Sequence, residues 1–331
     1  MVFLLFSAPF SLPWLTALPV LAAVLVNGWT DAPNAIATVI SSGTLSFRRA
    51  VLLSAGCNFL GVWLSGAVCP AVLDTLYAIA DFGTDPAAAL AALTAAMAAI
   101  VVWAVFAWCF GIPTSESHAL TAAVTGAAAA LQGSFTAIRP QAWGRVHFGL
   151  VFSLLGGALL GLLCALLLPH RPGYRRKQIW GAALLSFFHG AQDGQKFAGI
   201  LLLWAALAQG SLPQGRPHVP LGLLLLVALT MALGTLLGGE RIIRTLCKEM
   251  TCLPPREGFA ADLGSGLCLL LATLLGLPVS TTHAKAAALC GAGSLTPAGA
   301  SWTVAGRMAL MWAFTFPVCF VIGALAARLV L

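Results

Sequence analysis

Two polar motifs occur twice in this chain, once in each half and at nearly the same spacing. The letters GWTD at 28–31 return as GAQD at 190–193, and GIPTSESH at 111–118 returns as GLPVSTTH at 276–283. The first motif recurs after 162 residues and the second after 165, in a chain of 331 residues. A duplicated half that carries polar motifs within apolar surroundings is typical of a secondary transporter.

The chain around these motifs is too apolar for a soluble protein. It is 60% hydrophobic and 8% charged, with a mean hydropathy of +0.96, whereas a soluble domain is about 25% charged. Apolar stretches of roughly the 20 residues that span hydrocarbon recur from end to end. We therefore predict an all-α integral membrane protein, multi-pass in the cell membrane. The candidate stretches lie near 5–26, 50–73, 87–111, 146–168, 178–188, 197–209, 219–239, 260–277 and 302–330.

Basic residues gather between the apolar stretches, most densely in the middle of the chain. The sequence divides into a first transmembrane repeat at 1–168, a basic cytoplasmic linker at 169–178 and a second transmembrane repeat at 179–331. Positive charge in short loops marks the cytoplasmic side of a membrane protein. The net charge of +7 therefore indicates membrane topology, and we expect no nucleic-acid partner.

The segments after Pro113 and Pro278 are short and rich in small residues, which predicts re-entrant half-helices that pack closely. A proline ahead of hydroxyl residues marks a helix N-terminus. Such an end offers free N–H groups and a positive dipole, and so forms an anion site. Two such ends that meet at mid-membrane would hold a tetrahedral oxyanion; ordinary helix capping is the alternative. The hydroxyl residues are Thr114, Ser115 and Ser117 in the first copy and Ser280, Thr281 and Thr282 in the second.

The first aspartate motif follows an apolar run and contains glycine and proline, which break a helix. Irregular backbone at membrane depth persists only where protein or a water-filled cavity satisfies it, and a carboxylate there is functional by default. Asp31 and Asn34, with Asn27 beside them, therefore predict a site for a hard monovalent cation. The alternative is that Asp31 caps the next helix at the membrane interface.

The second aspartate motif has Lys196 where the first has Asn34. A lysine beside Asp193 predicts either a neutralising ion pair or a built-in cation that faces an anionic substrate, and we group Gln192 and Lys196 with the anion site. His189 could titrate near neutral pH or serve as a hydrogen-bonded structural residue.

At these residues the chain resembles the inorganic phosphate transporter family (PiT). The halves of that family repeat a G-A-N-D-x-x-N-A type motif and a G-x-P-x-S-x-[ST]-H type motif, which read here NGWTDAPNA with GIPTSESH and HGAQDGQK with GLPVSTTH. The segments 258–262 and 301–317 are similar as well. The resemblance implies two inverted structural repeats with broken helices and re-entrant helical hairpins. It also implies phosphate symport with Na⁺ or H⁺, and no other cofactor.

The resemblance further implies that the four motifs converge on one central site. Asp31, Asn34 and Asp193 would serve the cation, Na⁺ included, and the hydroxyl residues would serve the anion. Glu116 lies between the two serines of the first anion motif, where it would repel phosphate unless it faces away, is protonated or binds the coupling ion. We place it with the cation residues. Membrane lipid is an expected partner, and a homodimer is an arrangement that the sequence leaves open.

These observations predict a cation-coupled phosphate importer of a bacterial inner membrane that works by alternating access. A sulfate symporter of the same fold is the runner-up. A rival class is an intramembrane serine hydrolase, because Ser115 and His118, like Ser280 and His283, lie three apart on a helix. The pair occurs twice, however, and no acid orients it in both copies. A passive channel would need no coupling carboxylate.

Overall fold

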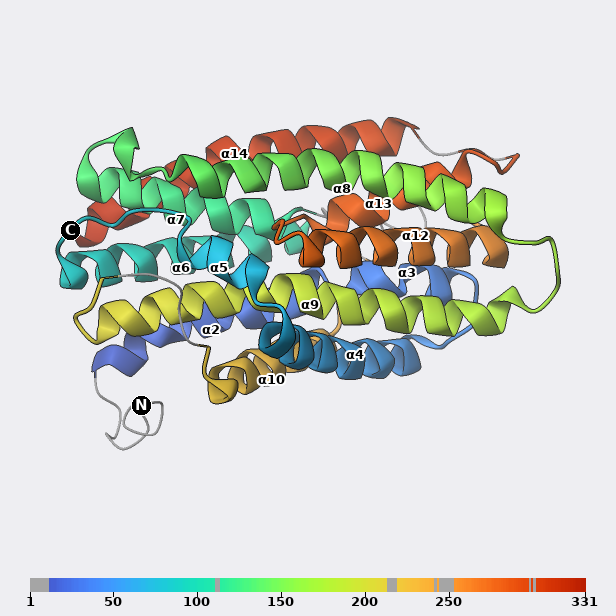
Figure 1. Cartoon of the computed structure of the whole chain (residues 1–331), viewed down its shortest axis with the longest axis horizontal. Coiled ribbons are helices and arrows are strands. Elements are labelled where there is room, and N and C mark those ends of the chain that lie inside the picture. Colours follow the sequence, from blue (N-terminus) through green and yellow to red (C-terminus); the bar gives the residue numbers. More distant parts are fainter. Residues whose placement is uncertain are drawn as a thin grey trace.

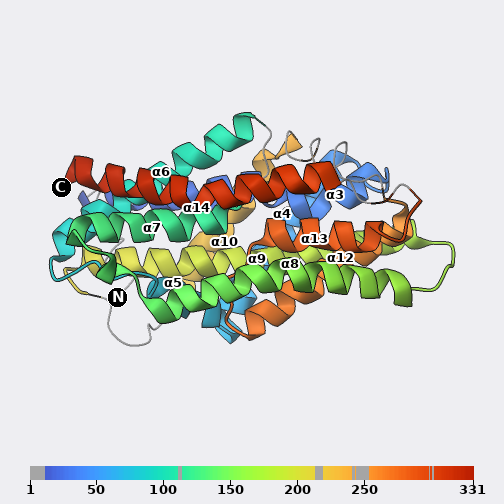
Figure 2. The same ribbon diagram turned by 90° about the horizontal axis from the view of Figure 1, so that it is seen from above.

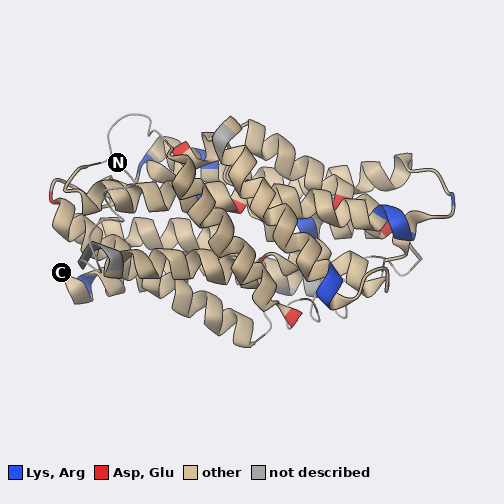
Figure 3. Ribbon diagram, turned by 90° about the horizontal axis from the view of Figure 1, so that it is seen from below, with Lys and Arg blue, Asp and Glu red and all other residues tan. Residues whose placement is uncertain are grey.

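The computed structural model describes residues 12–110, 114–212, 219–240, 243, 253–297, 299 and 302–331, and it is helical, without a β-strand in those ranges. Most of the helical bundle carries no charge, as Figure 3 shows by the scarcity of blue and red segments. The elements are α2 (Leu12–Thr30), α3 (Pro33–Ser41), α4 (Phe47–Val68), α5 (Ala71–Tyr77), α6 (Pro86–Cys109), α7 (Glu116–Gln132), η1 (Phe135–Ala137), α8 (Pro140–Leu167), α9 (Tyr174–Ala208), α10 (Leu221–Leu237), α12 (Pro255–Leu274), α13 (Thr281–Gly293) and α14 (Trp302–Val330).

Within the described ranges, five stretches are long and apolar enough to cross a membrane, judged by length and composition. A sixth is added if Phe47–Gly66 and Ala71–Tyr77, which are bent by 80° relative to each other, form one span. The predicted class of all-α membrane protein is confirmed. The five stretches are Leu15–Ser41, Pro86–Cys109, Pro140–Leu167, Pro255–Leu274 and Met308–Val330.

Two helical hairpins enter the bundle from opposite ends. Helices α6 and α7 occupy one end of the molecule, and α12 and α13 occupy the other (Figures 1 and 2). The N-terminal ends of α7 and α13 meet in the middle, where the Ser117 hydroxyl lies 3.5 Å from the Val279 carbonyl oxygen. The two short helices then run away from each other toward opposite ends (Figure 2). This arrangement fits the half-helices that the sequence predicts after the two prolines.

The last helix of each half covers the hairpin of the other half. Helix α14 packs on α6 and α7, and α8 packs on α12 and α13. The next helices repeat this pattern. Helix α4 of the first half packs on α9 of the second, and its counterpart α10 of the second half packs on α2 of the first. The inverted repeat stays a prediction, and these mirrored contacts support it.

Glycines bring the exchanged helices into backbone contact at corresponding positions. A Cβ atom on Gly126 of α7 would lie 2.1 Å from the carbonyl oxygen of Phe320 on α14. A Cβ atom on Gly291 of α13, which is 165 residues further along, would lie 2.1 Å from the carbonyl oxygen of Ala158 on α8. Only glycine permits so close an approach of two membrane helices, so both interfaces depend on the absence of a side chain.

The two aspartate motifs differ in backbone structure. In the first copy α2 ends at Thr30 and α3 begins at Pro33, so the helix is broken at Asp31 as predicted. In the second copy α9 runs for 35 residues without a break. The stretches 178–188 and 197–209 are thus one helix, which begins with the last five residues of the predicted linker. The reason is local: Gln195 stands where the first copy has Pro33, so no backbone N–H is lost.

Candidate functional site

All thirteen side chains predicted for the site are buried at the centre of the bundle, and none is more than 7% exposed. They come from the α2–α3 break, the middle of α9 and the N-terminal ends of α7 and α13. Gly111, Ile112 and Pro113 of the first anion motif lie outside the described residues. The structure therefore brings together the four motifs that the sequence singled out.

Asp31 is held by Thr282 from the opposite half and by Asn34 from its own half. The Thr282 hydroxyl lies 3.0 Å from Asp31 Oδ1 and 3.4 Å from the Thr114 carbonyl oxygen. Asn34 Nδ2 donates to the Thr282 hydroxyl at 2.9 Å and lies 3.4 Å from Asp31 Oδ1. Asp31 is thus buried in the interior of the bundle, and its side chain does not cap α3, whose N-cap is Ala32.

Asp193 has a lysine in its site. Lys196 Nζ donates to Asp193 Oδ1 at 2.6 Å, to the Ser117 hydroxyl at 2.6 Å and to the Val279 carbonyl oxygen. Asn27 Nδ2 and the Thr281 hydroxyl each lie 3.3 Å from the other carboxylate oxygen of Asp193. An ammonium group has three N–H donors, so the contacts of Lys196 account for all of them and form the neutralising ion pair.

Glu116 lies in the first turn of α7 and accepts a hydrogen bond from Thr30 of α2. Thr30 also lies 2.8 Å from the Val26 carbonyl oxygen. The carboxylate thus faces the α2–α3 break. This orientation points the Glu116 carboxylate toward the Asp31 region, in agreement with our grouping of Glu116 with the cation residues.

Gln192 extends from α9 toward the second hairpin. Its Nε2 donates to the Thr273 hydroxyl at 3.0 Å and lies 3.3 Å from the Leu277 carbonyl oxygen. Its side-chain oxygen has no hydrogen-bond partner in the described structure. Gln192 therefore offers a buried acceptor near the tip of the hairpin α12–α13.

The serine and histidine pairs do not form nucleophile–base contacts. Ser115 and Ser280 each cap their helix by accepting from the backbone N–H three residues ahead, at 3.4 and 3.3 Å. The imidazole rings of His118 and His283 instead pack edge to face, with centroids 4.6 Å apart. The capping alternative holds for these two serines, whereas the hydroxyls of Ser117, Thr281 and Thr282 contact groups of the aspartate sites.

His189 is hydrogen-bonded, which agrees with the alternative that it is a structural residue. Its Nδ1 lies 3.1 Å from Asn58 Oδ1, and its Nε2 lies 3.3 Å from Asp193 Oδ2. Ligand atoms of Asp31, His189 and Asp193 all lie within 4.8 Å of one another. Asn58 lies on α4, outside every motif, so sequence reasoning missed it.

A second buried ion pair was also missed. Lys285 of α13 donates to Asp262 of α12, and the Thr38 hydroxyl of α3 lies 2.8 Å from both carboxylate oxygens of Asp262. Both charged side chains are at most 1% exposed. The signal available in the sequence was the presence of two ionisable residues inside apolar segments, which is costly and functional by default.

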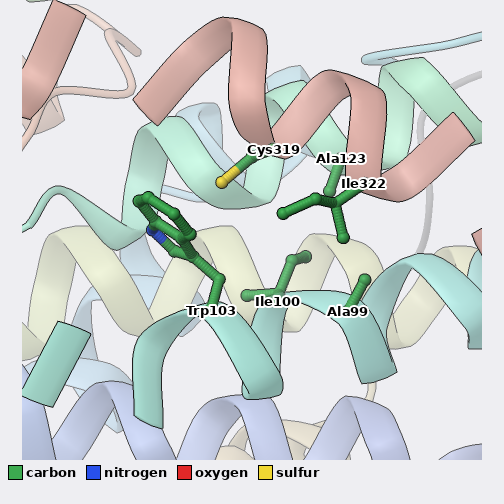
Figure 4. Close-up of a pocket in the computed structure, with 6 residues that line it drawn as sticks. All are labelled: Ala99, Ile100, Trp103, Ala123, Cys319 and Ile322. Carbon is green, nitrogen blue, oxygen red and sulfur yellow. The ribbon is translucent and has the colours of Figure 1, made fainter. Parts of the chain in front are cut away.

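One small cavity lies apart from the polar site. Its wall is apolar and comes from α6, α7 and α14 (Figure 4). A cavity of this kind offers an ion no ligand, so we place no part of the site there. The lining residues are Ala99, Ile100, Trp103, Ala123, Cys319 and Ile322.

Comparison with known proteins gives the same result at three levels. The sequence pattern of the Phosphate transporter family matches residues 27–177 and 170–323. A protein of Mycobacterium bovis that carries the name "Probable low-affinity inorganic phosphate transporter" is 36% identical over 325 residues, 94% of this chain and 75% of the relative. A Bacillus subtilis protein with the same name is 33% identical over 94% of this chain and 96% of its own length. The solved structure titled "The sodium-dependent phosphate transporter" has a TM-score of 0.87 over 97% of this chain and 99% of that chain, at 19% identity, and shares its fold.

Proposed function

Since the chain belongs to the phosphate transporter family, we propose that it imports inorganic phosphate together with a monovalent cation, by alternating access around the central site. The chain is a multi-pass membrane protein and a transporter, not an enzyme, and the serine hydrolase reading is set aside. The observation that carries the proposal is the meeting of two helix N-termini, α7 and α13, beside two buried aspartates.

The anion would bind at the meeting point of the two helix N-termini, which attract negative charge through their N–H groups and dipoles. The hydroxyls of Thr114, Ser117, Thr281 and Thr282 lie next to that point and would rotate to donate to phosphate oxygens. Ser115 and Ser280 would hold the helix ends in place. Gln192 would extend the site from α9. Lys196 was grouped with the anion residues as well, but its three donors are directed to Asp193, Ser117 and the Val279 carbonyl, so we leave it out of the anion site.

The cation would bind at the carboxylates, with Asp31 and Asn34 as its main ligands. Pro33 has no N–H, so the Trp29 carbonyl oxygen lacks its usual helical donor; in other transporters, carbonyls of discontinuous helices coordinate Na⁺. We favour Na⁺ over H⁺, because the structural neighbour is titled a sodium-dependent transporter. The repeats at 1–168 and 179–331 would then move relative to each other around this fixed site.

Sulfate is the second candidate substrate. Phosphate at neutral pH carries a proton that it can donate, and sulfate carries none. Glu116 provides an acceptor at the N-terminal end of α7, which favours phosphate. Unlabelled sulfate is therefore the competitor that separates the two candidates.

The test is uptake of radiolabelled phosphate into proteoliposomes under an imposed Na⁺ or pH gradient. We expect gradient-driven uptake that excess sulfate does not block. Asp31→Asn should abolish coupled uptake, because the cation loses its charged ligand, while the variant still inserts into the membrane. Asp85→Asn is the matched control: Asp85 is an exposed cap of α6, asparagine caps equally well, and uptake should persist. Full coupled uptake by Asp31→Asn would refute the cation site.

A further inference from the structure

The central site contains two sets of groups that correspond one to one between the halves. Each set has an aspartate, the residue three positions after it, a hydroxyl from the helix N-terminus of the opposite half and a backbone carbonyl from the aspartate's own half. The distances between partners are similar: the hydroxyl and carbonyl oxygens are 3.4 Å apart in one set and 3.5 Å in the other. The first set is Asp31, Asn34, Thr282 and the Thr114 carbonyl; the second is Asp193, Lys196, Ser117 and the Val279 carbonyl.

The two sets present the same kinds of group except at one position, where Asn34 corresponds to Lys196. The lysine ammonium in the second set lies among a carboxylate, a hydroxyl and a carbonyl oxygen. In the first set the Asn34 side chain is only 3% exposed, and its Oδ1 has no hydrogen-bond partner in the described structure. The first set thus has one buried oxygen acceptor to spare, whereas the second contains a positive charge.

The ligands around the lysine ammonium are those that a hard monovalent cation takes. Carboxylate, hydroxyl and carbonyl oxygens bind hard cations, and an ammonium group carries the same single positive charge. Each buried aspartate also needs a compensating charge, since an unpaired carboxylate at membrane depth is costly. The Lys196 ammonium neutralises Asp193 and, as part of the protein chain, cannot dissociate. The first set contains no positively charged side chain that would neutralise Asp31.

We propose that the Lys196 ammonium permanently occupies the position of a second coupling cation, so that the protein binds one monovalent cation, at the Asp31 set, for each phosphate. This inference rests on the proposed function. Because Lys196 cannot leave, Asp193 stays neutralised throughout the cycle and only the Asp31 set is loaded and unloaded. A chain with asparagine at both positions would load two cations.

The test replaces Lys196 with the residue that its counterpart carries. In proteoliposomes, the ratio of ²²Na⁺ to radiolabelled phosphate taken up is expected to be one for the natural protein and to rise about twofold in Lys196→Asn, since the second set becomes available to Na⁺. The dependence of uptake on Na⁺ concentration should steepen in parallel. Lys177→Asn, an exposed lysine in the first turn of the same helix, is the matched control and should keep the natural ratio.

The reciprocal variant protects the test against misfolding of Lys196→Asn. Asn34→Lys places an ammonium in the first set beside Asp31, and its residual phosphate uptake should lose its dependence on Na⁺. The purified variants give a second measurement: Na⁺ should raise the melting temperature of Lys196→Asn more than that of the natural protein, and that of Asn34→Lys less.

The outcomes separate this inference from the function on which it rests. No phosphate uptake by the natural protein would refute the proposed function. Phosphate uptake with two Na⁺ per phosphate, or with no need for Na⁺, would leave that function intact and overturn the role of Lys196. A folded Lys196→Asn variant with an unchanged ratio, or an Asn34→Lys variant that still depends on Na⁺, would overturn it as well.

Discussion

Two corresponding regions on either side of the central site are filled by opposite chemistry. The polar seam consists of Thr38, Asp262 and Lys285, which are bonded to one another. The apolar seam consists of the residues that occupy the corresponding positions in the opposite half of the chain. They are Ile200, Met97 and Leu120, and all belong to one hydrophobic cluster. All six side chains are at most 5% exposed.

The difference shows that this position of the repeat does not need an ion pair in order to be filled. Replacing a buried ion pair by apolar residues of similar volume is often neutral or stabilising, and the second copy of the architecture already has the apolar version. The two seams nevertheless resist opening for different reasons. Water that enters the polar seam can solvate two charges, whereas water that enters the apolar seam contacts hydrocarbon.

The comparison extends one step further from the centre. Beyond the polar seam, the Ser42 hydroxyl donates to the Gln178 side-chain oxygen at 2.7 Å. The corresponding residues beyond the apolar seam are Trp204 and Thr16, and the indole N–H donates to the threonine hydroxyl at 3.0 Å. A polar side-chain contact therefore recurs beyond both seams, and the chemistry of the two sides diverges at the seams.

The largest effect is expected from breaking the ion pair on one side only. Asp262→Leu leaves the Lys285 ammonium buried without its counter-charge, and removal of one partner of such a pair costs about 3–5 kcal/mol. The melting temperature in detergent and the yield of monodisperse protein should both fall sharply. The double variant Asp262→Leu with Lys285→Leu, which removes both charges, should recover most of the loss. Equal damage in the single and double variants would contradict this account.

A smaller loss is expected from truncating the apolar seam. Met97→Ala removes buried apolar volume and leaves a cavity, for which such substitutions cost about 2–5 kcal/mol. Thermal unfolding of the purified protein measures the effect, with Met97→Leu as the control of conserved volume, for which less than about 1.5 kcal/mol is expected. A loss as large in Met97→Leu as in Met97→Ala would show that shape and not volume governs this seam.

The smallest change in stability is expected when the residues of the polar seam are replaced by those of the apolar seam. The triple variant Thr38→Ile, Asp262→Met, Lys285→Leu gives the polar seam the residues of the apolar seam, and we expect it to fold with a melting temperature equal to or above that of the natural protein. Uptake of labelled phosphate by the same variant then reports on function separately from folding. Failure of the triple variant to fold would show that the two seams are not interchangeable in packing.

The sequence predicted the site better than the backbone that holds it. Because the motifs are duplicated, the buried positions of Asp31, Asp193 and the hydroxyl residues followed from the repeat. The continuous path of α9 did not, because the motif that both copies share hides the local cause: Gln195 keeps the backbone N–H that Pro33 lacks. Asn58 was missed for a different reason: it lies on a helix without a motif, and its contact with His189 is fixed only by the packing of α4 on α9.

The exchanged packing of the two halves bears on how such a chain arose. Each hairpin is covered by the last helix of the opposite half, across interfaces that depend on glycines such as Gly126 and Gly291. A half-length ancestor, on its own, would have exposed a bare backbone groove to lipid, and it could complete this architecture only by pairing with a copy inserted the other way up. With the predicted inverted repeat, fusion into one chain would fix the two orientations and leave the copies free to diverge. The lysine at 196, where the other half has the asparagine at 34, is a difference of the kind that such freedom permits.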